Sequence, residues 1–188
     1  MKFHSLKQRF EPYRDIIIFM VTLLVANYAW KWTMVGDEDG TVVTWLGLNI
    51  TAPFEMLSRH IAAVVYQLVS LFRDTVYMVG DYTIRFESGS GTKIVWACSG
   101  LKQSFIWLCL MLTTIGGWKQ KIWYIPLGWV VCYVFNILRI FLIAILIEYH
   151  PGWFDMLHTY IFKYLFYAVM FGMWVIFVEK IRSSASTN

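Results

Sequence analysis

Charged side chains are scarce in this sequence of 188 residues. Lysine, arginine, aspartate and glutamate together make up 15% of it, whereas 59% is hydrophobic and 19% is aromatic. An ordinary soluble domain carries about 25% charged residues. The composition therefore excludes a soluble globular domain and predicts a single integral membrane domain covering residues 1–188.

Cysteine is also rare, and the three residues are Cys98, Cys109 and Cys132. They form no CxxC pair and no metal-ligand spacing, and the last two lie deep in apolar runs. We therefore expect no disulfide framework, no metal and no cofactor. The net charge of +4 comes from short basic clusters between apolar runs, without interleaved aromatic residues, so we also expect no nucleic-acid partner.

Four apolar runs are long enough to cross a bilayer as helices, which takes about 20 residues each. No small-residue cleavage site closes the first run, so we expect a retained span rather than a signal peptide. In chain order, the predicted spans are residues 16–35, 98–116, 122–148 and 155–179.

Two segments between the first and second spans have mixed polarity. Residues 53–79 carry one polar stripe at helical spacing, which predicts an amphipathic helix lying in the membrane interface. Residues 81–97 alternate apolar and polar side chains around a Ser-Gly-Ser-Gly turn, which predicts a small β-hairpin. The expected fold is an all-α helical membrane bundle of about four transmembrane helices, with this interfacial helix and hairpin added.

Basic clusters set the expected orientation, because such clusters stay on the cytoplasmic side. They lie before residue 16, at residues 119–121 and at residues 180–182. Two basic clusters on the same side of the membrane must be separated by an even number of spans. This condition holds if residues 53–79 do not cross the membrane. The N-terminal residues 1–15 and the tail 180–188 are then cytoplasmic, while the acidic loop at 36–40 and the hairpin are outside. The alternative is a five-span protein that obeys the charge rule weakly.

Arg139 is an ionisable residue inside the third predicted span, where insertion costs roughly 2.5–3.5 kcal/mol. It follows Lys121 by 18 residues, or about 27 Å of helix, and so lies near the outer edge of a core about 30 Å thick. Asn136, three residues earlier, shares its helix face. The alternative role for Arg139 is snorkelling to the outer headgroups.

His158 follows Asp155, a candidate N-cap, and is expected in the first turn of the last span at the outer edge. An imidazole there exchanges protons near neutral pH. The alternative is an interfacial histidine with water partners, and His60 and His150 compete on the same side. Lys163 lies about 140° around an α-helix from His158, so we expect it to point elsewhere and snorkel.

Cys98 precedes Ser99, a candidate N-cap, and therefore lies at the positive end of a helix dipole. Lys102 is four residues further on and on the same face. Both effects favour the thiolate over the thiol. The alternative is a small buried core residue, as we expect for Cys109 and Cys132.

Three motifs in this order resemble the exosortase/archaeosortase family of membrane-embedded cysteine transpeptidases: Ala97-Cys98-Ser99-Gly100, Asn136-x-x-Arg139 and a downstream His158. The resemblance covers roughly residues 81–173 and indicates a compact bacterial member. It implies Cys98 as nucleophile, His158 as proton-transfer group and Arg139 as stabiliser of the oxyanion. Asn136, Lys102 and Ser99 are then supporting residues.

The resemblance also implies a substrate and a location. The substrate would be a membrane-anchored exported protein, cleaved at its C-terminal sorting signal through a thioester. The site would face outward from the bacterial cytoplasmic membrane, with the lipid bilayer as the other partner. The alternative function is a non-enzymatic partner or scaffold protein of an envelope assembly, in which Arg139 holds the bundle together. A small transporter is disfavoured, because the ionisable residues gather at one edge of the membrane.

Overall fold

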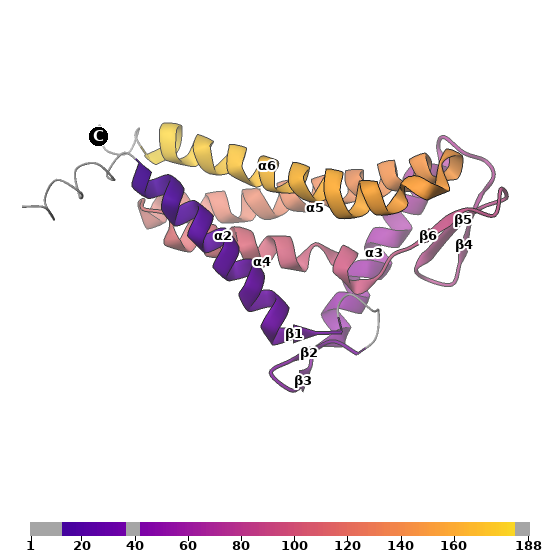
Figure 1. Cartoon of the computed structure of the whole chain (residues 1–188), viewed down its shortest axis with the longest axis horizontal. Helices are drawn as coiled ribbons and strands as arrows, with labels where there is room; N and C mark the ends of the chain where they lie inside the picture. Colours follow the sequence, from indigo (N-terminus) through magenta and orange to yellow (C-terminus); the bar gives the residue numbers. More distant parts are fainter. Residues whose placement is uncertain (1–12, 37–41, 183–188) are drawn as a thin grey trace, which may run out of the picture.

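The computed structural model describes residues 13–36 and 42–182. Most of the predicted cytoplasmic N-terminus, acidic loop and C-terminal tail lies outside these residues. Figure 1 shows α4, α5 and α6 running along the long axis of the molecule, with α2 crossing them obliquely and α3 at one end. The α-helices within these residues are α2 (Arg14–Thr33), α3 (Thr51–Ser70), α4 (Leu101–Thr113), α5 (Trp118–Tyr149) and α6 (Phe162–Ile176).

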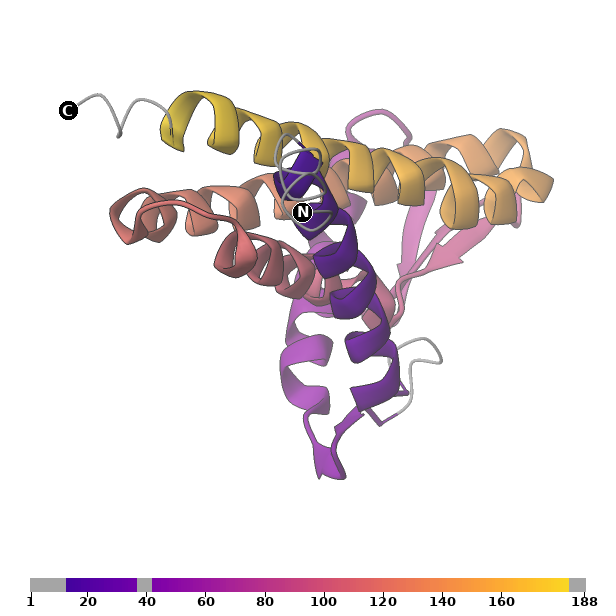
Figure 2. The ribbon, with the colours of Figure 1, turned by 60° about the vertical axis from the view of Figure 1, so that its left-hand side comes forward.

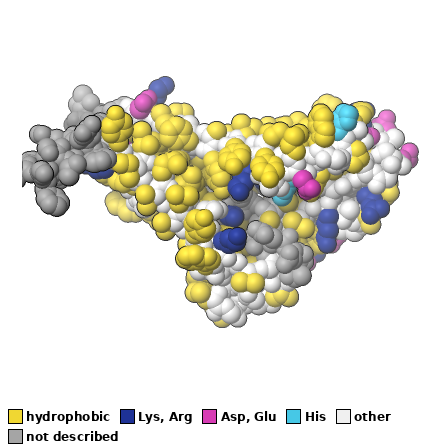
Figure 3. Space-filling model, viewed as in Figure 1, with side chains coloured by type: hydrophobic (Ala, Val, Ile, Leu, Met, Phe, Trp, Pro, Cys, Tyr) yellow, Lys and Arg dark blue, Asp and Glu magenta, His cyan; other side chains and the backbone are white. Residues whose placement is uncertain are grey.

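In the described part of the chain, three helical segments are long and apolar enough to cross a membrane. They are Arg14–Thr33, Trp118–Tyr149 and Pro151–Lys180, with mean hydropathies of 1.4, 2.6 and 1.9. In Figure 3 hydrophobic side chains cover the surface of the helical region, as contact with lipid requires. These segments confirm the predicted all-α membrane fold.

The last of these segments changes its helical type along its length. It begins with the 3-10 helix η3 (Pro151–Trp153), continues through the π-helix η4 (Met156–Ile161) into α6, and ends in the π-helix η5 (Phe177–Arg182). Asp155 takes the predicted N-cap position, directly before η4, but it has helical dihedral angles and its side chain makes no capping hydrogen bond among the described residues.

Helix α4 is shorter than the predicted span at residues 98–116. Its 13 residues reach about 20 Å, less than the thickness of a bilayer core of about 30 Å. Gly100, with a φ of 78°, starts the helix, and the backbone becomes extended at Thr114. That α4 crosses the membrane stays a prediction.

A three-stranded antiparallel sheet follows α3, formed by β4 (Val76–Val79), β5 (Thr83–Phe86) and β6 (Gly91–Lys93) in that order. Strands β5 and β6 confirm the predicted hairpin. Strand β4 corrects the predicted helix at residues 53–79, because α3 ends at Ser70 and Val76 pairs with Phe86. Val76 and Phe86 are both buried, so these apolar residues pack as a sheet face rather than continuing the helix.

A second, smaller sheet joins α2 to α3, and the sequence did not predict it. Its strands β1 (Met34–Val35), β2 (Thr44–Trp45) and β3 (Leu48–Asn49) have two residues each, which is too short for a visible alternation. Leu46 and Gly47 form the β2–β3 turn with positive φ angles. Figure 2 shows α2 and α3 converging at this sheet. Next to it, Val43 packs with Trp30 and Phe54 in one buried cluster.

Two larger buried clusters share α5. One joins α5 to α2, α4 and α6 through residues such as Trp107 and Phe166, and the other joins α5 to α3 and the β4–β6 sheet through residues such as Ile61 and Ile84. The C-terminal half of α5, which carries Asn136 and Arg139, therefore lies where the two groups of elements meet.

Candidate active site

Cys98 lies in a short 3-10 helix, η2 (Trp96–Ser99), that connects the β4–β6 sheet to α4. Its side chain is 7% exposed and belongs to the cluster that includes Ile137 and Ile140 of α5. The N-cap of α4 is Gly100 rather than Ser99, so that prediction is wrong. The chain turns sharply into α4 through the left-handed conformation of Gly100, which a glycine adopts without strain. Ser99 Oγ only accepts a long hydrogen bond of 3.4 Å from the Leu101 amide.

Asn136 holds this turn against α5. Its Nδ2 donates a hydrogen bond of 2.7 Å to the Cys98 carbonyl oxygen, and its side chain is 1% exposed. A Cβ at Gly100 would lie 3.4 Å from the same Nδ2, so a larger residue there would crowd the bond. The sequence analysis expected Asn136 to be a supporting residue on the helix face of Arg139, and in the structure its hydrogen bond fixes the backbone of Cys98.

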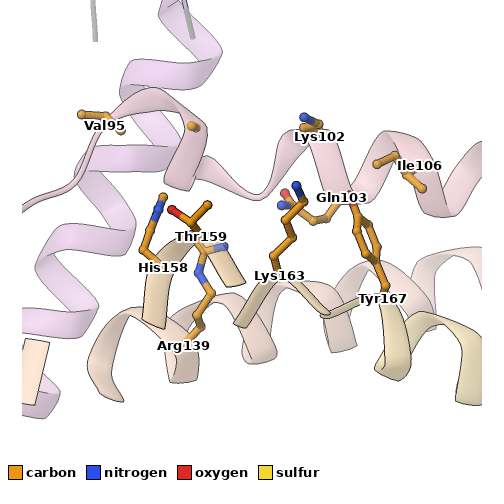
Figure 4. Close-up of a pocket in the computed structure, with 10 residues that line it drawn as sticks. Val95, Lys102, Gln103, Ile106, Arg139, His158, Thr159, Lys163 and Tyr167 are labelled. Carbon is orange, nitrogen blue, oxygen red and sulfur yellow. The ribbon is translucent and has the colours of Figure 1, made fainter. Parts of the chain in front are cut away.

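A cavity of about 380 Å³ lies beside this turn. It is bounded by the residues next to η2, the start of α4, the C-terminal half of α5 and the start of the final helical segment. Figure 4 shows Arg139 reaching from α5 toward His158 and Thr159. The lining residues are Val95, Ala97, Lys102, Gln103, Ile106, Arg139, His158, Thr159, Lys163 and Tyr167.

The cavity brings together three of the six predicted site residues, Lys102, Arg139 and His158. Cys98 does not line it, although its neighbour Ala97 does. Asn136 contacts the backbone of Cys98 from behind the cavity, and Ser99 lies in the same turn.

Arg139 is almost completely buried, with 6% of its side chain exposed. Its Nε has no hydrogen-bond partner in the described part of the chain. A snorkelling arginine keeps its guanidinium at the surface, so this placement does not fit the alternative role. Buried polar groups normally have partners, and a guanidinium that lines a cavity and whose Nε has no partner among the described residues is suited to binding negative charge.

His158 lies in the π-helix η4 and is half-buried, with its ring stacked on Phe154 at 5.4 Å between centroids. The two competing histidines have other contacts. His60 shares a hydrogen bond of 2.7 Å with the Tyr133 hydroxyl, and the His150 ring stacks on Trp153. Neither of them lines the cavity, so His158 is the histidine that this site offers.

Lys163 also lines the cavity, which corrects the expectation that it points elsewhere. That expectation assumed an α-helix, in which residues five apart lie on different faces. A π-helix places hydrogen bonds between residues i and i+5, so the turn containing His158 is wider and its side chains are rotated relative to α-helical phase. Lys163 and His158 consequently reach the same cavity.

Three polar lining residues were missed from the sequence, namely Gln103, Thr159 and Tyr167. Thr159, Lys163 and Tyr167 recur at four-residue spacing, so this polar stripe was a readable signal. Gln103 sits beside Lys102 in an otherwise apolar helix. Within the described residues, no group of three or more His, Cys, Asp or Glu side chains is placed to hold a metal ion.

Comparison with models of known families shows to which family the chain belongs. Residues 40–180 match the family model described as transmembrane exosortase. The chain belongs to the transmembrane exosortase family. The match includes η2 and every residue that lines the cavity, and membership supports a membrane transpeptidase role in general terms. Searches among curated proteins and among solved structures each found no match.

Proposed function

We propose that the protein is a membrane-embedded cysteine peptidase or transpeptidase that cleaves the C-terminal sorting signal of exported proteins. Cys98 is the nucleophile, His158 transfers protons and Arg139 stabilises the oxyanion. The observation that carries the proposal is the cavity beside η2, which is lined by the buried Arg139, the half-buried His158 and Ala97, the residue preceding Cys98.

The chemistry begins when His158 takes the proton of the Cys98 thiol. The thiolate attacks the scissile carbonyl carbon, and the carbonyl electron pair moves to the oxygen, where the Arg139 guanidinium binds the developing charge. The C–N bond then breaks, and the His158 imidazolium gives its proton to the leaving amine. The upstream part of the substrate remains attached to Cys98 as a thioester, while the apolar tail is released.

The second half of the reaction reverses the proton transfers. Neutral His158 takes a proton from the acceptor, which is water or an amine or hydroxyl group of an envelope component. The acceptor attacks the thioester carbon, Arg139 again faces the oxyanion, and the C–S bond breaks to restore the Cys98 thiolate. Cleavage with water is hydrolysis, and cleavage with the other acceptors is transpeptidation.

The burial of Cys98 places a requirement on this mechanism. The thiol is 7% exposed and lies in an apolar cluster, one residue away from the cavity lining. The thiol must therefore turn toward the cavity when substrate binds. The hydrogen bond from Asn136 to the Cys98 carbonyl fixes the backbone of this turn and does not restrain the side-chain torsion of Cys98.

The site is proposed to face outward from a bacterial cytoplasmic membrane. This location follows from the basic clusters at residues 119–121 and 180–182, which the charge rule assigns to the cytoplasm. Arg139 lies about 27 Å along α5 from Lys121, close to the thickness of the bilayer core. The cavity then opens near the opposite headgroup layer, where an exported protein emerges.

Reconstitution of the full chain in proteoliposomes tests the proposal. The substrate is a co-encoded protein that ends in a short polar motif, one apolar span and a basic tail. We expect a shortened product and a hydroxylamine-sensitive adduct on the wild type, and neither on Cys98→Ala. Arg139→Lys and His158→Gln should each slow cleavage, by roughly 10²–10³-fold for loss of one oxyanion donor.

Cys109→Ala is the matched control, because it removes a half-buried cysteine of α4 that does not line the cavity. It should cleave at the wild-type rate. Cleavage that persists in Cys98→Ala would refute the nucleophile. A wild-type protein that binds the substrate without cleaving it, in the presence of every acceptor offered, would favour the scaffold function instead.

A further inference from the structure

Strand β6 forms one edge of the β4–β6 sheet, because it pairs with β5 alone. The Ile94 amide donates a hydrogen bond of 2.7 Å to the Tyr82 carbonyl oxygen across this pair. Hydrogen-bonded and non-hydrogen-bonded residues alternate along an antiparallel strand. Gly91 and Lys93 therefore point their backbone N–H and C=O groups away from β5, toward the open edge.

This edge of β6 is exposed. Gly91 and Lys93 are exposed, whereas Thr92 and Ile94 are buried against the core. No hydrogen bond joins the outward backbone groups of Gly91 and Lys93 to another residue in the part of the chain that the structure describes. The Lys93 side chain projects from a face of the sheet, as strand side chains do, and leaves these groups open. Such an edge is a template for a further strand.

The edge leads directly to the candidate active site. Lys93 precedes Cys98 by only five residues, and Figure 1 shows β6 continuing toward the start of α4. Val95 keeps an extended backbone, with a φ of −89° and a ψ of 172°. Val95 and Ala97 both line the cavity. A peptide paired with β6 is therefore guided into the cavity along the same path.

We propose that the β6 edge binds the extended segment of the substrate that precedes the scissile bond, as a fourth strand of the sheet. The inference rests on the proposed function, which supplies the substrate. Main-chain hydrogen bonds to Gly91 and Lys93 hold such a segment whatever its side chains are. The added strand runs parallel to β6, because its downstream end must reach the cavity and continue into the membrane as the apolar tail.

Amide hydrogen exchange tests the proposal on the full-length Cys98→Ala variant in nanodiscs, with and without the co-encoded substrate. The substitution prevents turnover, and exchange is resolved to single amides. With saturating substrate, the Gly91 and Lys93 amides should exchange slower by about tenfold or more. Met78 is the internal control, because its N–H points outward from the opposite edge of the sheet, on β4. Its exchange should not change.

Proline at Lys93 removes one of the outward N–H groups, and an edge strand tolerates proline where the N–H faces away from the sheet. Lys93→Pro should weaken substrate binding about fivefold or more, which corresponds to one net hydrogen bond. Met78→Pro is the matched control on β4 and should bind as the wild type does. Lys93→Ala keeps the N–H and should bind more tightly than Lys93→Pro. Slow exchange at Thr92 and Ile94 verifies that the sheet remains paired.

The outcomes separate this inference from the proposed function. Unchanged exchange at Gly91 and Lys93, in a protein whose wild type cleaves the substrate, would overturn the added strand alone. Equal weakening in Lys93→Ala and Lys93→Pro would assign the contact to the lysine side chain and would also overturn it. Slower exchange at both amides without cleavage by the wild type would contradict only the proposed function. Neither slower exchange nor cleavage would contradict both. If Lys93→Pro fails to fold, the exchange measurement decides.

Discussion

The hydrogen bond from Asn136 to Cys98 is the contact in the described site whose removal has the clearest consequence. Asn136→Ala leaves the buried Cys98 carbonyl without a partner, and an unsatisfied buried acceptor costs about 1–3 kcal/mol. Part of this loss is offset, because Asn136 Oδ1 is itself buried without a partner and disappears with the side chain. At about 2–4 °C per kcal/mol for a chain of this size, the midpoint of thermal unfolding should fall by a few degrees.

The functional effect should exceed the effect on stability. Without Asn136 the backbone of η2 loses its hydrogen bond to α5, and a displacement of reacting groups by about 1 Å can lower a rate by about 10²-fold. We therefore expect Asn136→Ala to slow substrate cleavage by roughly this factor at a temperature where the variant is fully folded. Cleavage in proteoliposomes and unfolding in detergent are measured on the same preparation.

Thr114→Val is the matched control for Asn136→Ala. Thr114 Oγ1 accepts a hydrogen bond of 2.9 Å from Trp174 Nε1, and both side chains are buried at the end of α4 away from η2. Loss of this hydrogen bond in Thr114→Val should lower the free energy of unfolding about as much as Asn136→Ala does, and it should leave substrate cleavage unchanged. If Asn136→Ala loses stability as Thr114→Val does but cleaves at the wild-type rate, Asn136 does not position Cys98. Unchanged stability in Asn136→Ala would refute the hydrogen bond itself.

Two further predictions concern the packing of the bundle and its orientation. Gly128→Ala should lower the midpoint of thermal unfolding through about 1–3 kcal/mol of overpacking, because a Cβ there overlaps the Trp107 indole. The control is Gly172→Ala, whose Cβ meets nothing within 4 Å and should leave the midpoint unchanged. Equal midpoints in the two variants would refute the close contact between α4 and α5. Ser90→Cys in a cysteine-free background should label from outside intact cells with an impermeant maleimide, and labelling only after lysis would overturn the predicted orientation.

The long elements of the fold could be predicted from the sequence. A membrane span requires about 20 consecutive apolar residues, and this signal located α2, α5 and the final helical segment to within a few residues. The hairpin was also readable, because a Ser-Gly-Ser-Gly turn separates two alternating runs. Burial of alternate side chains such as Ile84 and Phe86 then follows from the pleat of the strand.

The errors arose where local patterns are ambiguous. Residues 76–79 continue the apolar character of α3, and four such residues fit a helix or a strand equally well until Val76 is seen to pair with Phe86. The small sheet of β1–β3 is too short to leave a pattern. For the site, chain order and helix faces indicated that Arg139 and His158 lie at one edge. The partner of Asn136 could not be predicted, because it is a backbone carbonyl 38 residues away.

Helix lengths explain why the cavity forms at this level of the bundle. Helix α5 has 32 residues and spans about 48 Å, whereas α4 has 13 and spans about 20 Å. Because only four residues separate the two helices, α4 can cover only the first part of α5. Asn136 and Arg139 lie about 27 and 32 Å from the start of α5, beyond the reach of α4.

The part of α5 that α4 does not cover, around Asn136 and Arg139, also packs against elements other than α-helices. The turn η2 contacts it through Asn136, and the π-helix η4 brings His158 to the cavity that Arg139 lines. A 3-10 turn and a π-helix do not interlock with α5 as regularly spaced α-helices do. The gap between them is enclosed by protein on several sides, and this is where polar groups are tolerated at membrane depth. The mismatch in helix length thus places Arg139 inside the protein rather than against lipid.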